Sequence, residues 1–223
     1  MRDNLDYTKE TFPNLETLDF NPLKLLKLKN TRKDKPGYIV ASGHSVREHP
    51  VNKLDGRNTI AINYSVIATP QAEMAIVNDA LFINDLGPIK KVLPKKVFTT
   101  SKIGDKSRCI FLKAIPDTGF SFDLLKGIHT NYTTTFSAIQ IAVWLGFNPI
   151  YILGMDLCKG KDGSTHFWGT DKNFQRDLEL YMDSIKGLLY STVQELKLKG
   201  TILKNCSPYI TLPDYEPTTL EWN

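Results

Sequence analysis

One stretch, residues 133–169, constrains the fold of this chain more than any other, because signals for a helix, a turn, a strand and a loop follow one another there. Three consecutive threonines offer hydroxyl caps for the start of a helix. Residues 136–145 are apolar on almost every side, which is typical of a buried helix. Gly146 stands where helices commonly end, and Pro149 prevents the helix from continuing.

A short apolar strand is predicted at residues 150–153, directly after this helix. Uninterrupted apolar strands of this kind occur in parallel sheets that are covered on both faces. In open α/β sheets, ligands bind beyond the carboxyl ends of the strands. Gly154, Met155 and Asp156 therefore stand at a candidate ligand site, and the polar loop that follows contains His166.

The same pattern, an apolar run that ends in small polar residues, occurs earlier in the chain at residues 38–41, 59–62 and 73–77. Further short strands are predicted at residues 81–83, 97–100, 109–112 and 201–203. Residues 174–199 have the apolar spacing of a long amphipathic helix. We therefore predict an α/β fold: a single Rossmann-like domain with a mostly parallel sheet, helices on both faces and a small lid.

The 223 residues are enough for one domain of this kind with a lid. We predict an N-terminal arm or helix at residues 1–35, the Rossmann-like domain at 36–207 and a C-terminal tail at 208–223. Within the domain, residues 113–132 contain glycines and phenylalanines without a clear periodicity. This composition predicts a mobile lid that closes on substrate.

Polar residues follow three successive predicted strands, namely Ser42, Asn63 and Asn78. Such side chains could hydrogen-bond a nucleotide at the edge of a doubly wound sheet. Asparagine also ends strands and turns the chain without any ligand, so the two interpretations are equally supported. Gly43 lies in a strand-to-helix turn that could bring backbone N–H groups to an anion, and His44 could add a donor.

Several function classes are excluded by missing motifs. The chain has no GxxxxGK[ST], GxGxxG, GxSxG or HExxH pattern, which disfavours P-loop nucleotidases, standard dinucleotide dehydrogenases and catalytic zinc sites. No metal site is predicted. Cys109, Cys158 and Cys206 lie far apart, so reduced thiols in a cytoplasmic protein are expected. We expect neither a signal peptide nor a membrane span, because no run of about 18 apolar residues occurs.

The net charge of +4 is compatible with a phosphate-bearing ligand but does not require one. Residues 90–108 are the most basic segment of the chain. This segment is either a solvated face or a surface that meets an acceptor with phosphates, such as DNA. The oligomeric state is left open by the sequence.

Five fragments of the sequence resemble a known family, namely IVASGHS, AIN, IVND, TTTFSAIQIAVWLGFNPIYILGMDL and STHF. They are similar to the Campylobacter-type sialyltransferases of glycosyltransferase family 42. They are also similar to related domains that include archaeal pterin diphosphokinases and flagellin-modifying transferases. The resemblance spans residues 38–207. It implies a glycosyltransferase that uses a CMP- or UDP-linked sugar donor, inverts the anomeric configuration and requires no cofactor.

The resemblance also implies roles for individual residues. Gly43 and Ser45 would lie at the phosphates, the threonines at the base or ribose, Asp156 at the ribose, and His166 would be the general base. The nucleotide-sugar site implied in this way comprises Ser42, Gly43, His44, Ser45, Asn63, Asn78, Asp79, Thr133, Thr134, Thr135, Gly154, Met155 and Asp156. Phe167 and Trp168 could form a stacking wall beside it or belong to the core.

The chain departs from the family pattern at two places. The family's turn carries Gly-Pro-Ser where this chain has His44 in the middle, and Cys158 aligns with a tyrosine that assists the leaving phosphate. The acceptor is therefore open, and both a glycan and a hydroxymethylated base in phage DNA are hypotheses. One alternative is a pterin-type diphosphokinase that uses ATP and Mg²⁺, with Asp79, Asp85 and Asp156 near the metal. The other is a non-catalytic nucleotide-binding module.

Overall fold

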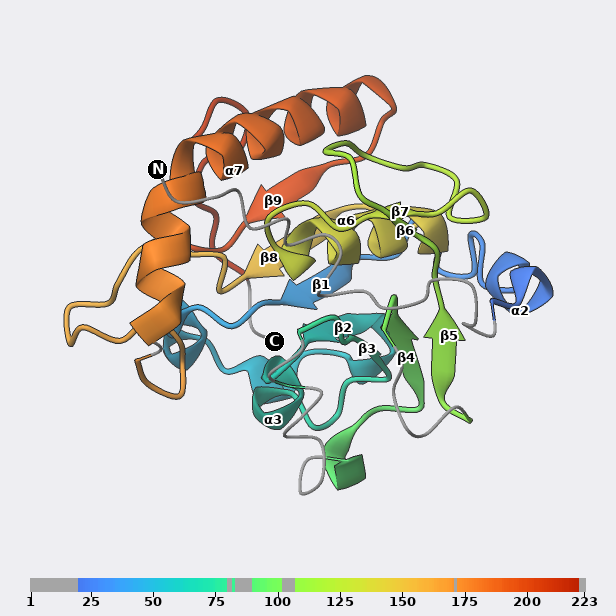
Figure 1. Cartoon of the computed structure of the whole chain (residues 1–223), viewed down its shortest axis with the longest axis horizontal. Coiled ribbons are helices and arrows are strands. Elements are labelled where there is room, and N and C mark those ends of the chain that lie inside the picture. Colours follow the sequence, from blue (N-terminus) through green and yellow to red (C-terminus); the bar gives the residue numbers. More distant parts are fainter. Residues whose placement is uncertain (1–19, 80–81, 83–89, 102–106, 171, 221–223) are drawn as a thin grey trace, which may run out of the picture.

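The computed structural model describes residues 20–79, 82, 90–101, 107–170 and 172–220. Within them, seven strands form a single sheet in the order β5-β4-β3-β2-β1-β8-β9 (Figure 1). Every neighbouring pair in this sheet is parallel. The strands are β1 (Gly37–Val40), β2 (Thr59–Ile62), β3 (Met74–Ile76), β4 (Lys96–Thr99), β5 (Cys109–Phe111), β8 (Ile150–Leu153) and β9 (Leu203–Asn205). The predicted α/β, Rossmann-like fold with a mostly parallel sheet is confirmed.

The predicted strands have nearly the bounds that the apolar runs indicated. The exceptions are residues 201–203, where β9 begins only at Leu203, and residues 81–83, which lie outside the described residues except for Phe82. Phe82 is fully buried and belongs to the core on one face of the sheet.

The order of the strands reverses beside β1. β1 pairs with β2 on one side and with β8 on the other, so that Tyr38 is in register with both Thr59 and Tyr151. The chain first builds the sheet outward from β1 to β5 and then returns to add β8 and β9 on the opposite side. The loops after β1 and β8 therefore lie at the topological switch point, where open α/β sheets bind their ligands.

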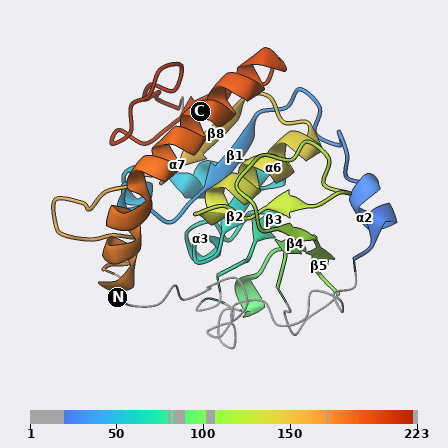
Figure 2. The same cartoon turned by 45° about the horizontal axis from the view of Figure 1, so that its top comes forward.

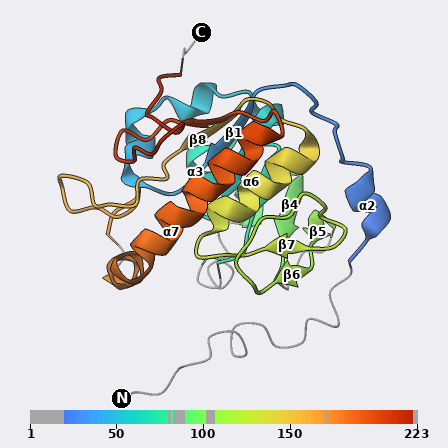
Figure 3. The same ribbon diagram turned by 90° about the horizontal axis from the view of Figure 1, so that it is seen from above.

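Helices cover both faces of the sheet, as predicted. α6 (Thr134–Leu145) and α7 (Lys172–Leu198) lie side by side on one face (Figures 2 and 3). The other face carries the short elements η2 (His44–Glu48), η3 (Val51–Lys53) and α3 (Ser65–Ala68), whose buried valines pack against the sheet there. A further short helix, η4 (Gly56–Asn58), directly precedes β2. Successive strand residues enter different cores, as Ile39 and Val40 illustrate, because side chains alternate across a strand.

α6 is the buried helix that the sequence predicts. The Thr133 side chain accepts a hydrogen bond from the backbone N–H of Thr135 at 3.3 Å, and Gly146 ends the helix with φ of +87°. The carboxyl end of α6 contacts the segment before β1, since the Arg32 N–H donates to the Leu145 carbonyl at 2.8 Å. The amino end of α6 consequently lies toward the carboxyl edge of the sheet.

Residues 113–132, where the sequence predicts a mobile lid, contain a short secondary structure of their own. They form a small parallel ladder between β6 (Ala114–Ile115) and β7 (Ile128–His129). Leu124 and Ile128 are fully buried in the core that contains α6. The apolar residues of this segment therefore pack into the domain, because the space beside α6 requires apolar side chains to fill it.

The described residues at both ends of the chain pack against the domain. α2 (Pro22–Leu26) buries Leu25 in the main core, and residues 1–19 of the predicted arm lie outside the described residues. In the predicted tail, Tyr215 is 2% exposed and Pro217 forms a parallel bridge with Asn205 of β9. The tail thus covers the edge of the sheet.

Among the described residues, a further short helix, η5 (Lys90–Val92), precedes β4.

Within the described part of the chain, no helix combines the length and the hydropathy that a membrane span requires.

Candidate functional site

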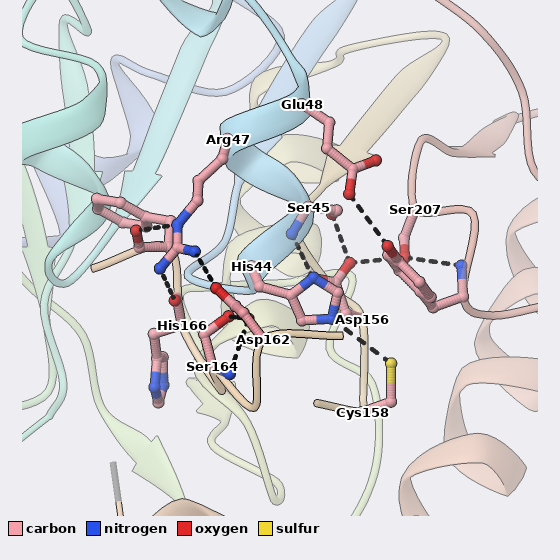
Figure 4. Close-up of polar contacts among 12 residues, drawn as sticks. His44, Ser45, Arg47, Glu48, Asp156, Cys158, Asp162, Ser164, His166 and Ser207 are labelled. Atoms are coloured by element: carbon pink, nitrogen blue, oxygen red, sulfur yellow. Dashed lines mark hydrogen bonds and ion pairs between the residues drawn. The ribbon is translucent and has the colours of Figure 1, made fainter. Parts of the chain in front are cut away.

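The loops that follow β1, β8 and β9 meet at the carboxyl edge of the sheet (Figure 4). The Gly43 N–H donates to the Gly154 carbonyl at 2.8 Å, which brings the first two loops into direct contact. A Cβ atom at Gly43 would clash with this carbonyl and with the Asp156 carboxylate. Gly154 has φ of +72°, a conformation that favours glycine, and a Cβ there would clash with Val46. Both glycines are therefore required by close packing.

Asp156 is the centre of this junction. It is only 3% exposed, and its carboxylate accepts hydrogen bonds from the Ser45 N–H at 2.8 Å, the Ser45 hydroxyl at 2.5 Å and the Ser207 hydroxyl at 2.7 Å. Hydrogen bonds of this number and length satisfy a buried carboxylate. Asp156 thus joins three loops, and its side chain faces protein donors rather than an open site.

In the turn at residues 43–45, two backbone N–H groups already donate to acceptors within the protein. Gly43 donates to Gly154, and Ser45 donates to Asp156. A phosphate that binds at this turn must use other donors. The pairing between residues 45 and 156 was missed by sequence analysis, although the two glycines that allow the loops to approach were recognised.

Arg47 holds the loop after β8 against η2. Its guanidinium donates to the Phe167 carbonyl at 2.6 Å, the His166 carbonyl at 3.2 Å and the Asp162 carboxylate at 2.8 Å. Hydrogen bonds from Ser164 and then from Arg47 hold the pKa of Asp162 well below its usual range. Sequence analysis missed Arg47 and Asp162, since a charged pair more than one hundred positions apart gives no local signal.

His166 lies in the tight turn that ends this loop. Its ring stacks on Trp168 with centroids 4.5 Å apart and an angle of 16° between the planes. The Nδ1 atom lies 2.9 Å from the Thr165 hydroxyl oxygen. If Nδ1 donates to this hydroxyl, Nε2 carries the lone pair that can accept a proton.

Trp168 is 44% exposed and connects the turn to the loop after β2. Its ring lies 4.7 Å from that of Tyr64, and Tyr64 in turn contacts Phe82 edge-on at 4.8 Å. Of the two interpretations of this aromatic pair, a half-exposed wall fits Trp168 better than a core position. Phe167 is partly buried and packs against the core.

The asparagines that follow β2 and β3 link neighbouring strand ends. The Asn63 side-chain oxygen accepts hydrogen bonds from the Asn78 N–H at 3.2 Å and the Asp79 N–H at 3.4 Å. The Asn78 side-chain oxygen accepts from the Thr100 N–H at 2.9 Å. Both asparagine side chains therefore bond the backbone at neighbouring strand ends, as expected of asparagines that turn the chain. Contact with a nucleotide stays a prediction. The Asn78 Nδ2 atom is buried, and the described residues offer it no acceptor.

The predicted site residues thus gather at one edge of the sheet. Ser42 contributes a hydroxyl 3.3 Å from that of Ser65, and its carbonyl accepts the Phe167 N–H at 3.0 Å. Met155 and Thr135 are both buried, with 3% of each residue exposed. They therefore pack beneath the surface of this edge. Thr133 and Thr134 begin α6 and are half-buried.

No group of three or more His, Cys, Asp or Glu side chains that could hold a metal ion occurs among the residues that the structure describes. Asp85, one of the carboxylates expected by the diphosphokinase interpretation, lies outside them. Asp156, another of these carboxylates, is occupied by three protein donors.

The described part of the basic segment lies away from this edge. Lys95 and Lys96 stand at the start of β4, and Arg108 directly precedes β5, so all three lie at the amino ends of the strands. Lys96 also forms an ion pair with Glu73. These cations therefore do not line the candidate site.

Known protein families and curated proteins give no match to this chain. Among solved structures, it is similar to the sialyltransferase CstII from Campylobacter jejuni in complex with a substrate analogue, cytidine-5'-monophosphate. The TM-score is 0.40 and the sequence identity 12%, over 83% of this chain and 85% of that chain. The roles of individual residues rest on the geometry described above.

Proposed function

We propose that this protein is a glycosyltransferase that uses a nucleotide-linked sugar, with His166 as the general base. The observation that carries the proposal is the setting of His166 at the carboxyl edge of the sheet. Its imidazole is stacked on the half-exposed Trp168 and held at Nδ1 by Thr165. An imidazole fixed in this way can accept a proton near neutral pH, and an aromatic face beside it can support a sugar or a base.

The donor nucleotide would be held by neutral groups at the ends of the strands and by the start of α6. α6 has 12 residues, and its amino end carries a partial positive charge that favours a phosphate. We propose a CMP- or UDP-linked donor.

The reaction would proceed in one displacement. The acceptor oxygen attacks the anomeric carbon from the face opposite the nucleotide, and the bond from that carbon to the phosphate oxygen breaks. His166 Nε2 takes the hydroxyl proton, and the nucleotide leaves with the bonding electrons. A general base of this kind accelerates a reaction by roughly 10²- to 10⁴-fold.

The first test is a thermal-shift panel with CMP, UDP, GDP, dTDP and ATP, each with and without Mg²⁺. A ligand at about 100 times its dissociation constant stabilises a fold by about 2.7 kcal/mol. Stabilisation by CMP or UDP without metal would support the proposal. Stabilisation by ATP with Mg²⁺ alone would support the diphosphokinase, and no stabilisation by any nucleotide would contradict both.

The second test compares two histidine variants in hydrolysis or transfer of the donor that binds. We expect His166→Ala to lower kcat by roughly 10²- to 10⁴-fold while nucleotide binding is retained. His129→Ala is the matched control, since His129 contacts the Asp117 carbonyl in the β6–β7 segment, and kcat should be unchanged. Glycans and hydroxymethylated duplex DNA, offered as competing acceptors, would identify the second substrate.

A further inference from the structure

Cys158 is the most accessible of the three cysteines, and it faces a buried imidazole. Cys109 and Cys206 are 4% and 3% exposed, whereas Cys158 is partly exposed. The Cys158 sulfur lies 3.7 Å from His44 Nε2, and the other ring nitrogen of His44 lies 3.6 Å from Asp156 Oδ2 (Figure 4). Thiol, imidazole and carboxylate thus follow one another in the order of a nucleophile, its base and the group that orients the base.

The carboxylate of Asp156 lies on one side of the His44 ring and the thiol on the other. Asp156 accepts three hydrogen bonds from serine groups, and its Oδ2 atom lies 3.6 Å from His44 Nδ1. In the tautomer that carries its hydrogen on Nδ1, this hydrogen points toward the carboxylate and the Nε2 lone pair faces the thiol.

His44 is also held rigidly. It is 5% exposed, and the edge-to-face contact with the Tyr209 ring has a centroid distance of 4.6 Å. On another side it lies against Gly160, where an added Cβ would come within 3.2 Å of the imidazole. A base that cannot turn away from its nucleophile is prepared for proton transfer.

We propose that Cys158, His44 and Asp156 form a relay that makes Cys158 a site of covalent modification by soft carbon electrophiles. In the reaction, a bond forms between the sulfur and the electrophilic carbon, and the bond from that carbon to its leaving group breaks. The leaving group departs with the bonding electrons, and the thiol proton passes to His44 Nε2. The inference is independent of the proposed glycosyl transfer.

Charged and titratable groups around the pair determine how it responds to pH. Asp156 faces His44 from the loop after β8, and Tyr209, whose hydroxyl donates to Glu48 at 3.0 Å, faces it from the segment after β9. Burial, and secondarily the Asp156 carboxylate, raises the pKa of the Cys158 thiol. The thiol therefore keeps its proton at rest, and the proton moves only as the sulfur attacks.

The test is the rate at which iodoacetamide modifies the native protein between pH 6 and pH 9, followed by intact mass and peptide mapping. We expect one adduct, on Cys158, with a rate that rises clearly less than tenfold per pH unit, because attack assisted by the imidazole does not require prior ionisation of the thiol. His44→Gln should lower the rate at pH 7 at least about tenfold and restore a tenfold rise per pH unit. Cys158→Ala, as a control, should give no adduct.

The pH dependence of the modification rate in the wild-type protein tests the proposal even if a variant fails to fold. A rate that rises tenfold per pH unit through pH 8.5 is the behaviour of an unassisted thiol and would overturn the proposal. An adduct on Cys109 or Cys206 in place of Cys158 would overturn it as well. So would a folded His44→Gln variant with the wild-type rate at pH 7.

Discussion

At Gly43 the chain has no room for a single methyl group. A Cβ there would meet the Gly154 carbonyl, which belongs to a backbone that cannot move freely, and the buried Asp156. We expect Gly43→Ala to lower the free energy of unfolding by about 1–3 kcal/mol, as overpacking does in a close-packed interior. Urea denaturation followed by circular dichroism measures this change.

The control for this variant is Gly187→Ala in α7. No atom lies within 4 Å of a Cβ built at Gly187, and the position is helical. Alanine should therefore raise the free energy of unfolding by about 0.5–1 kcal/mol, since glycine is costly inside a helix. A Gly43→Ala variant as stable as the wild type would show that the loops after β1 and β8 separate easily.

Single residues were predictable from the sequence where their role is local. Thr133 caps α6 and Gly146 ends it, and both roles follow from neighbouring residues. Asp156 was expected at a ribose, yet its hydrogen-bond donors are Ser45 and Ser207, which lie 111 and 51 positions away. No local pattern reports partners at such distances.

Among the elements, the buried Gln140 side chain of α6 links this helix to the β6–β7 segment. Gln140 is fully buried; its oxygen accepts from the Ser121 and His129 N–H groups at 3.0 Å each, and its nitrogen donates to the His129 carbonyl at 2.9 Å. Gln140→Leu keeps the size but leaves the Ser121 and His129 N–H groups without this acceptor. Each buried unsatisfied group costs about 1–3 kcal/mol. We expect faster amide hydrogen exchange across residues 113–132.

Gln194→Leu is the matched control for this experiment. Gln194 lies in α7 and donates to the exposed Asp214 at 3.0 Å, far from the β6–β7 segment in the sequence. Exchange in residues 113–132 should be unaffected by it. If exchange there is equally fast in the wild type and in Gln140→Leu, the segment already opens without the glutamine, as the predicted lid would.

The elements that were predicted well are those with strong periodicity or long apolar runs. β2 has the predicted bounds, and β8 follows α6 as expected. The β6–β7 segment was not recognised, because strands of two residues each show no alternation. The pairing of the predicted C-terminal tail with the sheet was missed for a similar reason. Its contribution to the sheet is a single bridge, between Asn205 and Pro217.

At the scale of the whole molecule, the C-terminal segment packs against the edge strand β9 and buries Tyr215. This side chain is 2% exposed, and its hydroxyl finds no hydrogen-bond partner among the described residues. We expect Tyr215→Phe to raise the free energy of unfolding by about 1 kcal/mol, because the penalty of a buried unsatisfied hydroxyl disappears. Thermal and urea unfolding measure the difference.

Tyr209→Phe is the comparison for this variant. The Tyr209 hydroxyl donates to Glu48 at 3.0 Å near the surface, so its removal should lower stability slightly or not at all. A loss of stability in Tyr215→Phe would mean that its hydroxyl does have a partner, such as a buried water molecule.

The class of fold was predictable at this scale, and the order of the strands was not. Short apolar strands that alternate with helical segments indicate a parallel sheet. They do not tell which strands β1 pairs with, because several strands here are apolar enough to occupy the centre. The pairing of Tyr38 with both Thr59 and Tyr151 depends on how the crossovers pack against the sheet.

The central position of β1 has a consequence for how the chain is made. β1 leaves the ribosome first among the strands, but one side of it stays unpaired until β8 at Ile150–Leu153 has been synthesised. A nascent chain that stops before β8 would expose an apolar strand with open backbone hydrogen bonds, which is a template for aggregation. The candidate site, built from the loops after β1 and β8, would come into existence only at this late step. Co-translational folding and acquisition of ligand binding should therefore coincide.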